Sequence, residues 1–136
     1  MRKVIIDAGI EHIHVRAYDY CPDKKSDILL NDIIIPNNDD LKNLFSKNEI
    51  FQLLPSKDNG LVNDEIDLYI TGKLADSTKN ILQQGRTIMP AAVLWSAAKF
   101  FFEKEKERQE SIGIIDLSAS GYMVICIDRE GNLKDD

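Results

Sequence analysis

Apolar and polar residues alternate near the N-terminus in a way that predicts a β-hairpin. Residues 3–7 (KVIID) form an apolar run that is β-branched at three positions and ends in a carboxylate, as is typical of a buried strand. Residues 12–18 alternate polar and apolar side chains with period two, which is typical of a strand with one buried face. The glycine-bearing segment 8–11 between them predicts a tight turn.

Two further strands are predicted by apolar runs downstream. Residues 27–35 (DILLNDIII) predict a third strand that is stopped by Pro36, and residues 66–71 (IDLYIT) predict a fourth. The polar segment 55–63 (PSKDNGLVN) between them predicts a surface loop.

Capping residues predict two short helices. Residues 38–40 (NDD) are expected to cap a helix that runs through Phe45, because Asx side chains accept the free amide hydrogens at a helix start. A second helix is predicted over residues 76–84, opening at Asp76-Ser77 and ending with Gly85 at its C-cap.

A longer helix and a second hairpin are predicted in the remainder. The helix starts at Pro90 and runs towards Arg108, and the charge run 103–110 (EKEKERQE) is its solvated end. Its predicted apolar face consists of Val93, Leu94, Ala97, Phe100 and Phe101. Residues 112–117 and 122–128 predict two strands joined by a Ser-Ala-Ser-Gly turn.

This order of elements predicts an α/β fold with a mixed sheet covered by helices. The 136 residues are 43% hydrophobic and 29% charged, as in a globular protein with one sizeable core. The net charge of −6 argues against binding nucleic acid through phosphate neutralisation. The apolar run 88–98 is half of the ~20 residues that a membrane span needs. Cys21 and Cys126 form no CxxC pattern and predict buried thiols of a cytoplasmic protein, with a disulfide as the alternative.

Two carboxylates stand at equivalent places in the two predicted hairpins. Asp7 ends an apolar strand before a small-residue turn, and Asp116 ends another before the Ser-Ala-Ser-Gly turn. Two carboxylates that face each other across a cleft can hold hydrated Mg²⁺, and exposed turn amides can hold phosphate oxygens. The alternative is that each aspartate caps an ordinary turn.

Four segments resemble the ASKHA superfamily of actin-like, ribonuclease H-like ATPases, and most closely the ATPase activators of 2-hydroxyacyl-CoA dehydratases and benzoyl-CoA reductases. KVIIDAGIEHIHVRAYD is similar to the first phosphate hairpin, and LYITGKLADSTKNILQQG to the strand and helix that carry a Thr-Gly segment. PAAVLWSAAKFFF is similar to the next helix, and IGIIDLSASGYMVICIDREGNLKDD to the second phosphate hairpin.

The resemblance implies a ribonuclease H-like domain whose mixed sheet has antiparallel first three strands and flanking helices. It implies Mg²⁺ and ATP, with Asp7 and Asp116 as catalytic residues that hold Mg²⁺ through water. The nucleotide-binding residues that it implies are Gly9, Ile10, Glu11, Gly72, Ser118, Ala119, Ser120 and Gly121.

Both phosphate loops depart from the family pattern. Where the family has hydroxyl residues after the first glycine, this chain has Ile10, Glu11 and His12, and Glu11 brings a negative charge near the expected phosphates. The second loop, glycine-rich in the family, reads Ser-Ala-Ser-Gly here. We therefore expect the N-terminal part of an ASKHA-type ATPase without ATP turnover by itself. The alternatives are a structural or partner-binding domain that lost the nucleotide site, and a sensor of another small molecule.

The resemblance also divides the chain into two parts. Residues 1–110 correspond to a first domain, and residues 111–136 to the opening hairpin of an incomplete second one. We expect a homodimer or a missing C-terminal half to cover that hairpin. The implied partner is an acyl-CoA dehydratase-type enzyme, and no iron–sulfur cluster, nucleic acid or membrane is expected to bind this chain.

A few remaining side chains have two interpretations. His12 and His14 share one face of the predicted second strand, either as metal ligands or as ordinary exposed histidines. Arg86 either touches an anion or is a surface arginine, and Trp95 is predicted to pack in a core or an interface.

Overall fold

The computed structural model describes residues 2–54, 66–104, 110–118 and 121–134. The predicted loop over residues 55–63 lies outside them. The chain divides into two compact units, Met1–Thr87 and Ile88–Asp136, and each is described by itself. Among the described residues, no helix combines the length and apolar character that crossing a membrane requires.

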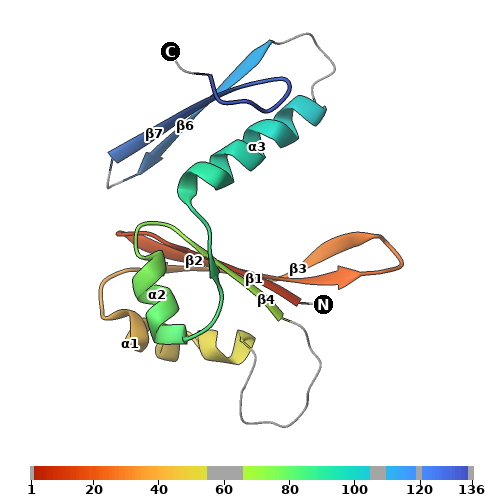
Figure 1. The fold of residues 1–136 in the computed structure, drawn as a ribbon. Helices are drawn as coiled ribbons and strands as arrows, with labels where there is room; N and C mark the ends of the chain where they lie inside the picture. The colour runs from red at the N-terminus through yellow and green to blue at the C-terminus, as the bar shows by residue number, and fades with distance from the viewer. Residues whose placement is uncertain (1, 55–65, 105–109, 119–120, 135–136) are drawn as a thin grey trace. The chain divides into compact units, whose positions relative to one another are not determined.

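The described part of the first unit is built on a five-stranded mixed sheet (Figure 1). In sheet order the strands are β3 (Ser26–Pro36), β2 (His12–Cys21), β1 (Arg2–Ala8), β4 (Ile66–Thr71) and β5 (Arg86–Thr87). The pairs β1–β2 and β2–β3 are antiparallel, whereas β1–β4 and β4–β5 are parallel. These pairings confirm the predicted α/β fold with a mixed sheet whose first three strands are antiparallel.

The strands differ from their predictions mainly in extent. β2 and β3 both run further than residues 12–18 and 27–35, because they continue as a paired ribbon up to the pair Cys21 and Ser26. Pro36 is the last residue of β3, which is an edge strand, so its missing N–H interrupts no ladder. β5 was not predicted, since a strand of two residues carries no periodic pattern.

Helices α1 (Leu41–Lys47) and α2 (Ala75–Leu82) and the 3₁₀ turn η1 (Ile50–Leu53) pack on one face of this sheet (Figure 1). Alternate strand residues point towards that face because strand side chains have a period of two. The fully buried strand residues are Val4, Ile6, Ala8, Ile13, Val15, Ala17 and Ile70. Each large aliphatic side chain buried in this way contributes about 1.5–3 kcal/mol to the free energy of unfolding. The same alternation leaves Asp7 and His14 on the opposite face.

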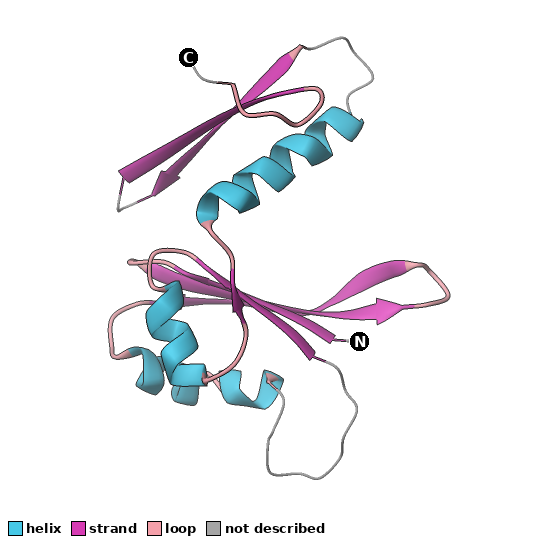
Figure 2. Cartoon of the chain, in the orientation of Figure 1, coloured by secondary structure: helices cyan, strands magenta, loops and turns pink. Residues whose placement is uncertain are grey.

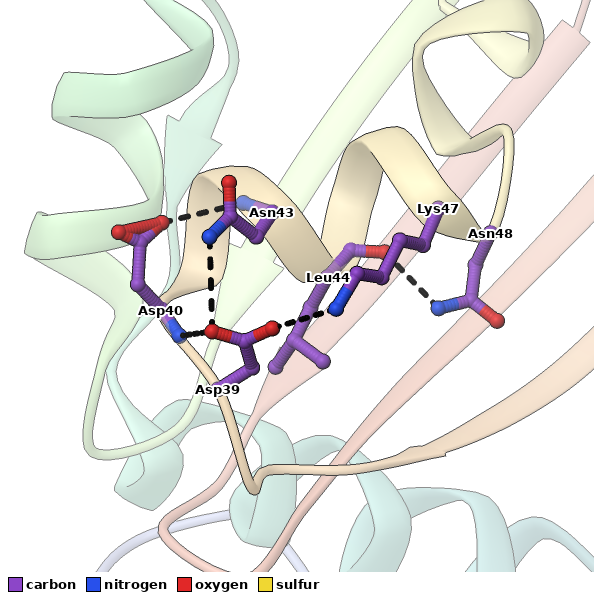
Figure 3. Close-up of polar contacts among 6 residues, drawn as sticks. All are labelled: Asp39, Asp40, Asn43, Leu44, Lys47 and Asn48. Carbon is purple, nitrogen blue, oxygen red and sulfur yellow. Dashed lines mark hydrogen bonds and ion pairs between the residues drawn. The ribbon is translucent and has the colours of Figure 1, made fainter.

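Side chains bind the backbone at both ends of α1 (Figure 3). The carboxylate of Asp40 accepts a 3.0 Å hydrogen bond from the Asn43 N–H, which confirms the predicted cap at residues 38–40. Asp39 Oδ1 accepts a second bond, 2.8 Å long, from the Asp40 N–H. At the other end, Asn48 Nδ2 donates a 2.8 Å bond to the carbonyl of Leu44. The bonds at the start of α1 satisfy N–H groups that have no partner within the helix, and the Asn48 side chain adds a second bond to the Leu44 carbonyl, which also accepts from the Asn48 N–H.

Helix α2 differs from its prediction at both ends. Its N-cap is Leu74, which makes no side-chain capping bond, and Asp76 lies within the first turn instead of opening the helix. Its C-cap is Gln83, in the left-handed conformation with φ 52°, so the prediction of Gly85 as the cap was wrong. Gly85 is needed for space, because a β-carbon there would lie 2.9 Å from Leu68 Cγ.

The second unit joins helix α3 (Pro90–Lys104) to the antiparallel hairpin of β6 (Ser111–Ser118) and β7 (Gly121–Asp128) (Figure 2). After β7 the chain turns back, and Leu133 forms an isolated bridge with Ile127. The buried core of this unit consists of Ala98, Phe102, Ile125 and Ile127. The partly buried residues around it are Ala91, Leu94, Trp95, Ile112 and Ile114.

The predicted apolar face of α3 was wrong at three positions. Val93, Phe100 and Phe101 are 42%, 55% and 52% exposed. The hairpin instead packs on the arc of the helix that carries Ala98 and Phe102. The helix is apolar over more than one arc, so its sequence alone does not indicate which arc meets the hairpin. Residues 105–109 of its predicted extension lie outside the described residues.

Helix α3 therefore shares a core with the β6–β7 hairpin. The predicted division into residues 1–110 and 111–136 came from the resemblance to a family whose proteins have two domains. The two compact units are defined by contacts within this chain alone, so they do not test that division, and it stays a prediction.

Candidate functional site

The candidate site of the first unit lies where β1 and β4 end. These strands are parallel, and Asp7 stands opposite Thr71 in their register, so their carboxyl ends meet at one corner of the sheet. Gly72 follows with φ +94°, and a β-carbon there would lie 2.6 Å from both Asp7 Oδ1 and Ala8 O. Only glycine fits this position. The structure thus brings together two predicted site residues, Asp7 and Gly72.

The turn that follows Gly72 is hydrogen-bonded to the end of β1. The Leu74 N–H donates a 2.9 Å bond to the Ala8 carbonyl, and the Ala75 N–H donates a 3.2 Å bond to the Gly72 carbonyl. These bonds place the first turn of α2 beside the end of β1. The free amide groups of a helix start carry partial positive charge, which favours anions nearby.

The turn between β1 and β2 forms the second wall of the corner. The Gly9 N–H donates a 3.0 Å bond to the His12 carbonyl, and a β-carbon at Gly9 would lie 2.8 Å from that oxygen. Glycine therefore permits the close approach of the two strands. Ile10 and Glu11 form the exposed tip, so the carboxylate of Glu11 stands on the turn predicted to bind phosphate.

Asn37, the residue after β3, makes two hydrogen bonds to the β1–β2 turn. Its Nδ2 donates a 3.2 Å bond to the Gly9 carbonyl, and its backbone N–H donates a 2.7 Å bond to the Glu11 carbonyl. Asn37 was not predicted as a site residue. The available signal was an Asx residue two positions after the predicted strand 27–35, because Asx side chains often bind turn backbones.

The face of the sheet opposite the helices carries a charged row that starts at Asp7. Asp7 stands opposite His14 in the β1–β2 register, and His14 Nε2 hydrogen-bonds to Asp32 Oδ1. Arg16 Nε lies 3.4 Å from the same Asp32 oxygen. The pKa of Asp32 is held below its usual value, first by the hydrogen bond from His14 and then by the Arg16 charge. His14 is thus bound to a carboxylate.

The described residues contain no group of three or more His, Cys, Asp or Glu side chains arranged to hold a metal ion. The described residues therefore offer no third ligand that would complete a metal site with His12 and His14. Mg²⁺ differs from most metals because it often binds through one or two carboxylates and substrate phosphates while keeping several waters. The absence of a three-ligand group among the described residues therefore does not test Asp7 as a water-mediated Mg²⁺ ligand, which stays a prediction.

The second hairpin carries the other predicted site residues. Asp116 is exposed on β6 opposite Met123. Ser118 Oγ donates a 3.3 Å bond to the carbonyl of Gly121, whose φ is +137°. Ala119 and Ser120 lie outside the described residues. Since Asp116 and Asp7 belong to different units, their joint catalytic role stays a prediction.

No protein-family model matches the chain, and none of the curated proteins matches it either. Solved structures do match. Three structures of Ppx/GppA proteins from Aquifex aeolicus, one described as the type II variant of a Ppx/GppA phosphatase, align with TM-scores of 0.50, 0.51 and 0.53. Each is 10% identical in sequence, and each alignment covers 99% of this chain but only 49–50% of the other.

The chain has an actin-like, ribonuclease H-like fold. Ppx/GppA phosphatases have ASKHA-type nucleotide-binding folds, so the chain shares its fold with proteins of that type. At 10% identity the likeness extends to the fold alone. The chain spans about half the length of the structures that it matches. The comparisons do not support the narrower resemblance to acyl-CoA dehydratase activators.

Proposed function

We propose that the chain is the N-terminal part of an ASKHA-type nucleotide-binding protein. Its β1 end, β1–β2 turn and β4–α2 turn would bind the phosphates of a Mg²⁺-nucleotide. The observation that carries this proposal is the close approach of Gly72 to Asp7 and Ala8. A glycine with positive φ lets the β4–α2 turn approach the Asp7 carboxylate and the end of β1 closely, so that both turns meet at one corner beside a carboxylate that can hold the Mg²⁺ of a nucleotide.

In this proposal each hairpin has a defined role. Asp7 would hold Mg²⁺ through water, and the turn residues 9–11 together with Gly72 would face the phosphates. Asp116 would do the same from the second hairpin, where residues 118–121 would bind the nucleotide. Two such carboxylates orient Mg²⁺ and an attacking water in phosphoryl transfer. Since the chain spans half of its structural neighbours, we propose that turnover depends on residues beyond these 136.

The reaction and the partner are further parts of the proposal. One of the Aquifex structures is described as that of a Ppx/GppA phosphatase, which supports hydrolysis of a phosphate bond as the activity of the complete site. Activation of an acyl-CoA dehydratase-type enzyme, coupled to ATP hydrolysis, rests on the sequence segments alone. A test of that role is direct: the activator hypothesis requires the complete protein to restore activity to such a dehydratase.

One observation favours a second function, a binding domain that has lost the nucleotide. The exposed carboxylate of Glu11 stands at the tip of the phosphate turn, where like charges disfavour a phosphate. In that case the fold would serve as a structural or partner-binding module.

A thermal shift with MgATP distinguishes the two functions. At about 100 times its dissociation constant, the ligand adds about 2.7 kcal/mol to the free energy of unfolding. We expect a raised Tm in the wild type, no rise in Asp7→Asn, and an unchanged rise in the control Asp67→Asn. Asp67 lies at the other end of β4, so the control changes the same charge away from the corner. A wild type without any rise would favour the binding module.

A further inference from the structure

We propose that Asn37 is a positioning residue that orients the backbone N–H groups of the β1–β2 turn towards the phosphate. This inference rests on the proposed function, because it names the residue that orients the turn's donors. The family-like hydroxyl residues are replaced here by Ile10 and Glu11. Neither Ile10 nor Glu11 carries a side-chain donor, so the donors at the tip of this turn are its backbone N–H groups, and their direction affects whether the turn binds a phosphate.

Asn37 sets the direction of two peptide planes. The described peptide bonds are trans, and in a trans peptide the carbonyl and the following N–H point in opposite directions. The Gly9 carbonyl accepts from Asn37 Nδ2, so the Ile10 N–H points away from Asn37. The Glu11 carbonyl accepts from the Asn37 N–H, so the His12 N–H points away as well. One residue thus orients both donors.

The sheet order shows where these donors point. Asn37 directly follows β3, which lies on the far side of β2 from β1 and β4. Groups that point away from Asn37 therefore point towards the side of β1 and β4, where Asp7 and Gly72 meet. Backbone N–H groups that converge on one side bind anions such as phosphate. Rotating either peptide plane would replace a donor by a carbonyl oxygen, which repels phosphate.

Asn48 provides a matched control within the same unit. Its Nδ2 also donates one part-buried hydrogen bond to a backbone carbonyl, that of Leu44, at the end of α1 (Figure 3). Asn37→Ala and Asn48→Ala thus each remove one amide-to-carbonyl bond without changing the charge. A merely structural role for Asn37 predicts the same consequences for both variants.

The experiment measures MgATP binding to the ¹⁵N-labelled 136-residue chain and both variants, with each affinity corrected for the folded fraction. We expect Asn37→Ala to raise the Kd about tenfold or more, and Asn48→Ala to stay within about twofold of the wild type. The amide resonances of Ile10 and His12 should shift with MgATP in the wild type and in Asn48→Ala. Equal affinity losses in the two variants, or an unchanged Kd in Asn37→Ala, would overturn the positioning role.

Two different measurements test the proposed function and the role of Asn37: MgATP binding by the wild type tests the first, and the ligand-free spectra test the second. If the wild type binds no MgATP, the proposed function fails, and the ligand-free spectra then decide the role of Asn37. Asn37→Ala removes the side-chain bond to the Gly9 carbonyl and keeps the backbone bond to the Glu11 carbonyl, so the Ile10 amide is the one that it tests. A displaced Ile10 amide resonance in Asn37→Ala, together with an unchanged one in Asn48→Ala, would support the orientation of the turn by Asn37. An unchanged Ile10 resonance in Asn37→Ala would overturn it.

Discussion

The indole Nε1 of Trp95 donates a 2.8 Å hydrogen bond to the carbonyl of Gly131. Trp95 lies on α3 and Gly131 in the turn after β7, so the bond connects the helix to the end of the hairpin. The ammonium of Lys99 lies 4.6 Å from the centre of the indole ring and adds a cation–π contact. The prediction that Trp95 is a packing residue is confirmed.

Removal of this bond should weaken the second unit. Trp95→Phe keeps an aromatic ring but leaves the Gly131 carbonyl without its indole donor. We expect the free energy of unfolding to fall by about 1 kcal/mol or more, measured by urea unfolding. Phe101→Leu, at a position 52% exposed, should change it by less than about 0.5 kcal/mol. Equal effects of the two substitutions would contradict a specific role for the indole.

Acid should loosen the same turn. The Asn132 N–H donates a 2.8 Å bond to Asp128 Oδ1, and this bond is the first cause that lowers the pKa of Asp128. Because the folded pKa lies below the unfolded value, the stabilisation is present above the unfolded pKa and is lost as pH falls through the folded pKa, below about 3.8.

The single tryptophan reports this transition through its fluorescence. We expect the signal of Trp95 to change below that pH in the wild type and in the control Asp23→Asn. In Asp128→Asn the acid-dependent change should be reduced, and an identical acid profile in this variant would rule out Asp128 as the titrating group.

Gly72→Ala should affect both stability and the proposed site. The new β-carbon would meet Asp7 Oδ1 and Ala8 O at 2.6 Å, and alanine is strained at φ +94°. We expect a loss of about 1–3 kcal/mol in the free energy of unfolding, together with weaker MgATP binding. In the control Gly113→Ala nothing lies within 4 Å of the new β-carbon, so little change is expected. A Gly72→Ala protein as stable as the wild type would contradict the packing at this corner.

Thr78→Val should leave the first unit at least as stable as the wild type. Thr78 is fully buried on α2, and its Oγ1 has no hydrogen-bond partner among the described residues. Replacing the hydroxyl by a methyl group of similar size removes a buried polar group without a partner. We expect this to raise the free energy of unfolding by up to about 1 kcal/mol. The exposed Thr87 provides the control Thr87→Val, for which thermal unfolding should show no gain. A clear loss of stability in Thr78→Val would show that the hydroxyl does bind a partner.

The outer face of the β6–β7 hairpin should make the chain self-associate, as the expected homodimer requires. Leu117 and Tyr122 stand opposite each other in the hairpin register, and each is 78% exposed. We expect a concentration-dependent dimer in sedimentation equilibrium, which Leu117→Lys combined with Tyr122→Lys weakens. Met89→Lys, at a position 72% exposed, should not weaken it. A wild type that stays monomeric at high concentration would rule out this dimer.

Local patterns in the sequence were sufficient for most of the first unit. The strands of period-two alternation and the Asp40 cap depend on residues close together in the chain, and the structure has both of them, with β1 ending one residue after Asp7. The mixed sheet was predictable for the same reason, because antiparallel hairpins and helix-linked strands follow from the order of elements.

The remaining features were decided by tertiary contacts between distant residues. Gly85 is required by the side chain of Leu68, and the buried arc of α3 was selected by the hairpin from a helix that is apolar over more than one arc. Asn37 binds the carbonyl of Gly9, which lies in a turn far earlier in the chain. The sequence by itself determined which segments become strands and helices, since their periodicity and caps act locally. Only the tertiary structure decided which glycines, amides and apolar faces meet, because those contacts depend on packing in three dimensions.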